Sequence, residues 1–175
     1  LKVTKATGGQ AGSFVIEDTD AGAPVYGFTF TAKILVGGGT STPADGFSIN
    51  FAPDIDTAAI PGEEGMGSGI RISFDTYDNG NENPPAPSID FRLGNNLIAT
   101  KKKSNTEMLT FPNGSPQAFA DVSLSVTAGG ALTLVYKGET IFDHVYFPGY
   151  QAISGGRLAI GGRTGGSTEN VWLDD

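Results

Sequence analysis

Short runs of alternating apolar and polar residues dominate the chain. The clearest, residues 28–36, projects one set of apolar side chains to a single face: Phe28, Phe30, Ala32, Ile34 and Val36. A period of two indicates a half-buried β-strand. The pattern recurs in runs at 47–51, 70–74, 89–93, 120–126, 132–136 and 158–160. No window has the i, i+3, i+4 spacing of an amphipathic helix, so we expect about ten or eleven antiparallel strands.

Glycine marks the boundaries between these runs. The chain has 26 glycines in 175 residues, and they cluster at 37–39, 129–130, 155–156 and 165–166. Glycine adopts the positive φ angles and close backbone approaches that tight turns require. The sequence therefore predicts an all-β fold, a two-sheet antiparallel β-sandwich of the jelly-roll type.

Length and charge limit the possible partners. With 175 residues and 38% apolar residues, the chain is predicted to form one domain over residues 1–175. A formal charge of -8 argues against nucleic acid and anionic membranes. The chain has no 18-residue apolar stretch, so we expect no membrane insertion. It begins at Leu1 without a leader, and we expect a piece excised from a larger extracellular protein. The absence of cysteine excludes disulfides and thiolate metal sites and says nothing of the compartment.

A polar segment after one predicted strand carries the chemistry of a metal site. Asp75, the Tyr77 carbonyl and Asn79 offer three oxygens at i, i+2 and i+4, and a hard cation such as Ca²⁺ prefers oxygen ligands. The alternative is a plain turn, since Asp-Asn-Gly favours local backbone hydrogen bonds. An EF-hand is excluded because Ala86 stands where that loop needs a glutamate.

Three segments in the middle and at the end of the chain resemble the L-type lectins, which include the legume seed lectins, of the concanavalin A-like superfamily. The first is Ala44-Asp45-Gly46 followed by the strand ending in Ala52-Pro53, and the second is Phe74-Asp75-Thr76-Tyr77-Asp78-Asn79. The third runs from Gly161 to Leu173. Their order matches that family and implies the concanavalin A-like jelly roll.

The resemblance implies a sugar site built from loops. Its binding residues would be Asp45, Gly65, Tyr77, Asn79, Gly165, Gly166 and Ser167. Asp45 would accept hydrogen bonds from sugar hydroxyls after a cis Ala44–Asp45 peptide, and the Tyr77 ring would stack on a pyranose. The alternative for Asp45-Gly46 is a simple hairpin turn.

The resemblance also implies one calcium ion, held by Asp75, Tyr77, Asn79 and Glu82, with Asp78 as the competitor of Glu82. Ser73 and Ala86 stand where the family places a glutamate and a histidine for a transition metal. The transition-metal half of the family's double site is therefore predicted to be lost.

These features predict a calcium-dependent carbohydrate-binding module that is secreted or at the cell surface, with a possible homodimer. One alternative is a structural or adhesive spacer of the same fold without sugar binding. The other is a polysaccharide lyase or glycoside hydrolase. The strand at 71–78 lacks the paired glutamates of retaining hydrolases, and His144, the single histidine, has no relay partners. We therefore expect no enzyme activity.

Overall fold

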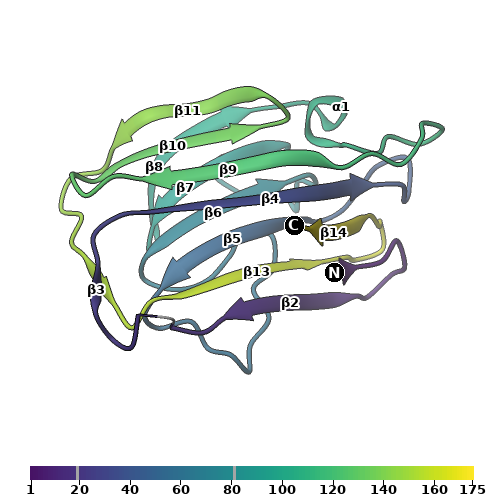
Figure 1. Cartoon of the computed structure of the whole chain (residues 1–175). Helices are drawn as coiled ribbons and strands as arrows, with labels where there is room; N and C mark the ends of the chain where they lie inside the picture. The colour runs from purple at the N-terminus through teal and green to yellow at the C-terminus, as the bar shows by residue number, and fades with distance from the viewer. Residues whose placement is uncertain (19, 81) are drawn as a thin grey trace.

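Two antiparallel sheets pack face to face in the computed structural model, which describes residues 1–18, 20–80 and 82–175 (Figure 1). Sheet I has the order β1 (Lys2–Thr4), β14 (Asn170–Asp174), β4 (Phe28–Gly37), β9 (Ala120–Val126), β10 (Ala131–Tyr136), β11 (Glu139–Tyr146). Sheet II has the order β2 (Ala11–Ile16), β13 (Arg157–Arg163), β5 (Gly46–Ala52), β6 (Ile70–Asp75), β7 (Ser88–Leu93), β8 (Asn96–Lys102). A small ribbon pairs β3 (Pro24–Val25) with β12 (Ile153–Ser154), and α1 (Asn105–Met108) is a single helical turn.

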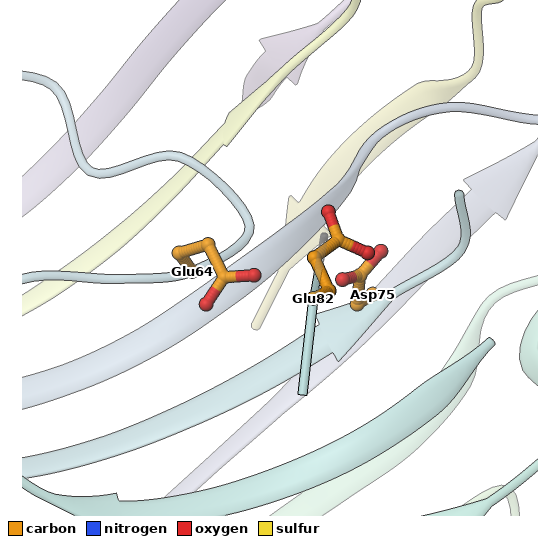
Figure 2. A group of neighbouring side chains, drawn as sticks. All are labelled: Glu64, Asp75 and Glu82. Atoms are coloured by element: carbon orange, nitrogen blue, oxygen red, sulfur yellow. The ribbon is translucent and has the colours of Figure 1, made fainter. Parts of the chain in front are cut away.

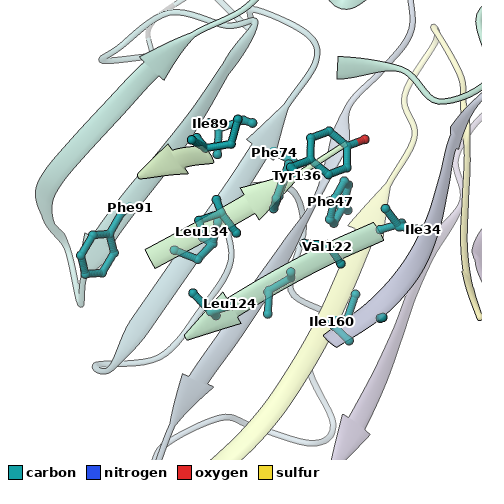
Figure 3. Packing of buried hydrophobic residues seen from close by; sticks show 14 of the residues in the cluster. Ile34, Phe47, Phe74, Ile89, Phe91, Val122, Leu124, Leu134, Tyr136 and Ile160 are labelled. Carbon is teal, nitrogen blue, oxygen red and sulfur yellow. The ribbon is translucent and has the colours of Figure 1, made fainter. Parts of the chain in front are cut away.

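The core lies between the two sheets because each strand turns its apolar set inward. Phe47 of β5 stacks on Phe74 of β6 with ring centroids 4.2 Å apart, and Phe74 meets Tyr136 of β10 edge-on at 5.1 Å (Figure 3). The Tyr136 hydroxyl donates to the Met108 carbonyl at 2.6 Å, which satisfies the one polar atom of that buried ring. Sheet-on-sheet burial of this kind stabilises a sandwich without disulfides.

The predicted all-β sandwich is confirmed, and each predicted run lies in a strand. Two expectations were wrong in detail. The described chain has fourteen strands, two of them only two residues long, and it has the helical turn α1. Among the described residues, no helix is long and apolar enough to cross a membrane.

Sheet II has a second face, turned away from the core, that we call the outer face. Side chains alternate along β6, so Ile70, Ile72 and Phe74 are in the core while Arg71, Ser73 and Asp75 project to the outer face. Two connections cover this face: the β5–β6 loop, residues 53–69, and the β6–β7 loop, described at residues 76–80 and 82–87.

Candidate functional site

A polar pocket of ≈ 460 Å³ lies on the outer face of sheet II between the two loops. Its volume is in the range of small-ligand sites. Almost every side chain around it is charged or carries an amide. The lining residues are Glu63, Glu64, Arg71, Asn79, Glu82, Asn83, Pro84, Arg92, Asn95 and Arg163. Such a lining suits a hydroxyl-rich or charged ligand better than an apolar one.

Buried polar groups of β5 fix the β5–β6 loop on the sheet. Ser48 donates from Oγ to the Gly62 carbonyl at 2.6 Å, and Asn50 Oδ1 accepts from the Met66 N–H at 3.0 Å. Both side chains are fully buried. Buried amide and hydroxyl groups are costly when unpaired, so these bonds define where the loop lies.

The predicted metal residues lie at the end of β6 and in the loop that follows. Asp75 is 2% exposed, and its Oδ1 accepts from the Tyr77 N–H at 3.0 Å. The Asn79 Nδ2 donates to Glu82 Oε1 at 2.7 Å and to the Tyr77 carbonyl at 3.4 Å. The other Glu82 oxygen, Oε2, is buried and has no hydrogen-bond partner. Asp78 instead accepts from the Gly80 N–H at 2.7 Å, so its carboxylate closes a local turn.

A third carboxylate, which sequence reasoning missed, joins Asp75 and Glu82. Oxygens of Glu64, Asp75 and Glu82 all lie within 4.8 Å of one another (Figure 2). Burial raises the pKa of Asp75 to about 8, and the nearby Glu82 and Glu64 carboxylates add to that rise. Burial also raises the pKa of Glu64. The group therefore favours either protons or a bound cation.

Asp45 lies beside this cluster but does not line the pocket. Its peptide bond with Ala44 is cis, as the family resemblance implies. The Asp45 N–H donates to the Arg163 carbonyl at 3.0 Å, and the Asp45 carbonyl accepts from the Thr76 N–H at 3.1 Å. The Asp45 side chain is 8% exposed, with Oδ2 3.5 Å from Arg163 Nε. Burial raises the pKa of this carboxyl.

The predicted glycine positions differ in their surroundings. A Cβ on Gly165 would lie 3.6 Å from Asp45 Oδ2, so the loop at 165–167 adjoins that carboxylate. Gly166 faces open space, and Ser167 is half-buried. Gly65 uses its N–H within the β5–β6 loop, where it donates to the Gly62 carbonyl at 3.2 Å. A Cβ at this position would come too close to Asn50 Oδ1.

Sequence reasoning also missed an ion pair at the pocket wall. Arg163 donates from Nε to Glu63 Oε2 at 2.7 Å and from Nη2 to Glu63 Oε1 at 2.5 Å. Glu63 is 1% exposed, so this two-bond pair attaches the β5–β6 loop to β13. The adjacent Glu63-Glu64 in a glycine-rich loop was the available signal, because an acidic side chain that is buried needs a partner.

Glu169 forms a buried support behind the site. It is fully buried, and its Oε1 accepts from the Thr76 hydroxyl at 3.0 Å. Its other oxygen has no hydrogen-bond partner. Burial raises the pKa of Glu169 to about 8, which keeps it largely protonated near neutral pH.

Comparisons with known proteins identify the architecture. No family model and no curated protein matches the sequence. Solved structures do match. The exoplasmic/lumenal domain of VIP36 in its Ca²⁺/Man3GlcNAc-bound form has a TM-score of 0.67 at 15% identity, covering 99% of this chain and 74% of that one. Lectin II from Ulex europaeus has a TM-score of 0.64 at 20% identity, covering 99% and 84%.

A lectin from Bauhinia forficata in complex with GalNAc has a TM-score of 0.58 at 14% identity, covering 96% of this chain and 78% of that chain. All three matches extend over almost the whole chain, through both sheets and the connecting loops. At these identities the likeness concerns the fold. The chain has the concanavalin A-like lectin fold.

Proposed function

We propose that this domain is a calcium-dependent carbohydrate-binding module that works outside the cytoplasm and is not an enzyme. The observation that carries the proposal is that carboxylate oxygens of Asp75 and Glu82 lie within 4.8 Å of each other, while Glu82 and its hydrogen-bond partner Asn79 line a polar pocket. Two proteins with the same fold have been solved with such ligands. The VIP36 domain has a structure with Ca²⁺ and Man3GlcNAc, and the Bauhinia lectin has one with GalNAc.

The donor set fits a hard cation. Calcium takes six to eight oxygens at about 2.3–2.6 Å, and the site offers carboxylate, amide and carbonyl oxygens. The Asn79 amide nitrogen now lies between Glu82 Oε1 and the Tyr77 carbonyl, where its partial positive charge joins two oxygens. Rotation of that amide by a half-turn would present its own oxygen instead. The unpartnered Glu82 Oε2 is a further donor.

Bound calcium would neutralise Asp75 and Glu82 and hold the β6–β7 loop. Asn79 would then present its amide to sugar hydroxyls, and Asp45 would accept from them where Gly165 leaves its carboxylate uncovered by a side chain. Tyr77, half-buried in the same loop, is the proposed stacking ring.

Glycoside hydrolysis is the second candidate, and one observation favours it. The three carboxylates lie within 4.8 Å of one another, near the roughly 5–5.5 Å separation of the catalytic pair in retaining glycosidases. A raised pKa like that of Asp75 also suits a general acid. Calcium and catalysis need the same oxygens, so the two candidates give opposite results when calcium is added.

A glycan array probed in calcium and again in EDTA tests the proposal. We expect binding to at least one glycan class in calcium and its loss in EDTA. Equal binding in EDTA would remove the role of calcium. No binding under either condition would favour the spacer, to which the low exposure of Asp45 already lends support. Release of reducing ends that calcium inhibits would favour the hydrolase.

A further inference from the structure

Glu64 lies in the β5–β6 loop, whereas Asp75 ends β6 and Glu82 lies in the β6–β7 loop, and the backbone of Glu64 is fixed independently of these two residues. Arg71 of β6 donates to the Glu64 carbonyl from Nη2 at 2.6 Å and from Nε at 3.2 Å. Arg71 itself is held by the Gly94 carbonyl at 3.1 Å and by Asn95 Oδ1 at 3.0 Å. The position of Glu64 is therefore set by the sheet, whether or not an ion is present.

The Glu64 carboxylate extends from this anchor toward Asp75 and Glu82 (Figure 2). Two ligand oxygens on opposite sides of a calcium ion, each at about 2.3–2.6 Å, are separated by up to about 5 Å. One oxygen from each of the three carboxylates lies within 4.8 Å of the others, so a single calcium ion could contact all three. Among the described residues, no arginine or lysine nitrogen comes within 4 Å of any of the three. Their mutual repulsion is therefore not offset by an ion pair.

A buried hydroxyl without a partner gives a second, independent indication of a ligand. Ser73 is 2% exposed, and its Oγ has no hydrogen-bond partner. It projects from the outer face of β6 between Arg71, which holds the Glu64 backbone, and Asp75, which Glu64 reaches. Ser73 thus projects to the same face as Asp75, the face on which the β5–β6 loop with Glu64 is held by Ser48 and Arg71. An unsatisfied buried hydroxyl is costly, and an ion or its bound water would satisfy it.

We propose that Glu64 is a ligand of the divalent cation, so that one ion connects the β5–β6 loop to the β6–β7 loop across the pocket. This inference rests on the proposed calcium site and adds a ligand from the opposite wall. Both walls of the pocket are then set by the same ion. Calcium controls the shape of the whole pocket rather than the β6–β7 loop alone.

Calcium titration by calorimetry on the parent, Glu64→Gln and Asp174→Asn tests the proposal. Asp174→Asn is the control because it removes one negative charge from an exposed position on sheet I. We expect Glu64→Gln to weaken calcium binding at least tenfold and Asp174→Asn to change it less than twofold. Equal weakening in both variants would show that the loss of affinity comes from the change in net charge, and it would overturn the proposal.

Hydrogen exchange gives a second readout, and its main arm uses the parent protein, so that it does not depend on the folding of a variant. Added calcium should slow amide exchange in both loops, and in Glu64→Gln it should slow exchange only in the β6–β7 loop. Calcium binding with protection confined to the β6–β7 loop of the parent would contradict the role of Glu64 while leaving the calcium site intact. A parent that binds no calcium would instead contradict the proposed function itself.

Discussion

Replacing Asp75 with asparagine should have opposite effects on stability with and without calcium. Asparagine keeps an oxygen that can accept the Tyr77 N–H bond, but it removes the buried charge. In the metal-free protein, burial raises the pKa of this carboxyl to about 8 from the ordinary 3.8. A carboxyl with a raised folded pKa loses its stabilising contribution as pH rises through the folded value. Metal-free parent stability should therefore fall between about pH 4 and pH 8, and part of that fall should be absent in Asp75→Asn.

The magnitudes follow from two general relations. Each pKa unit corresponds to about 1.4 kcal/mol, so the raised pKa opposes folding of the metal-free parent by a few kcal/mol at pH 8. Calcium at about 100 times its Kd adds about 2.7 kcal/mol to the parent. For a chain of this size, 1 kcal/mol moves Tm by about 2–4 °C, so calcium should raise the parent Tm by about 5–11 °C.

Calorimetric melting at pH 5 and pH 8, in EDTA and in calcium, measures all of these terms. At pH 8 in EDTA, the Tm of Asp75→Asn should lie above that of the parent. Added calcium should raise the Tm of the parent only. The calcium shift of the parent should be larger at pH 8 than at pH 5, because the ion displaces a proton from Asp75. A calcium shift of equal size in Asp75→Asn would show that Asp75 is not a ligand. A variant less stable than the parent in EDTA at pH 8 would refute the argument from the buried charge.

The remaining predictions concern the sugar, the buried support and catalysis. Asp45→Asn should abolish glycan binding in array assays with little change in Tm, because Arg163 keeps its bonds to Glu63; undiminished binding would place the sugar elsewhere. Tyr77→Ala should retain calcium, whose ligand there is a backbone carbonyl, and weaken glycan binding by about 0.5–1.5 kcal/mol in calorimetry. Glu169→Gln should raise Tm at pH 8 more than at pH 5, since its folded pKa of about 8 lies above the ordinary 4.5; a uniform shift at both pH values would contradict this. Incubation with laminarin, xylan, cellulose or alginate should release no reducing ends or unsaturated uronate, and turnover lost in Asp75→Asn would support the hydrolase instead.

Alternation predicted the strands whose two faces differ, and it missed the strands at the edges. Residues 28–36 alternate because one face of β4 packs in the core. In β2, Phe14 and Ile16 are 42% and 37% exposed, so burial imposes no pattern on that edge strand. The helical turn α1 was also missed, although Ser104 and Glu107 form the capping box that marks a helix start.

The proposed metal residues at the end of β6 and in the β6–β7 loop were predictable as candidates because they are close in sequence and keep a fixed spacing. Glu64 was not, since its place depends on bonds from Ser48, Asn50 and Arg71 that dock one loop onto a distant face. Gly65 was chosen from the same loop for a ligand-binding N–H, and the structure gives that N–H to a turn. Loop docking through single side chains of neighbouring strands leaves no local periodicity from which it could be predicted.

The most direct test is a crystal structure of the domain with calcium and the glycan that binds best on the array, with the ion located by anomalous scattering. We predict one ion coordinated by Asp75, the Tyr77 carbonyl, Asn79 and Glu82, with Glu64 as the ligand from the opposite loop and the sugar contacting Asn79 and Asp45 beside the pocket. An ion at another place, or a glycan bound away from the outer face of sheet II, would contradict the account.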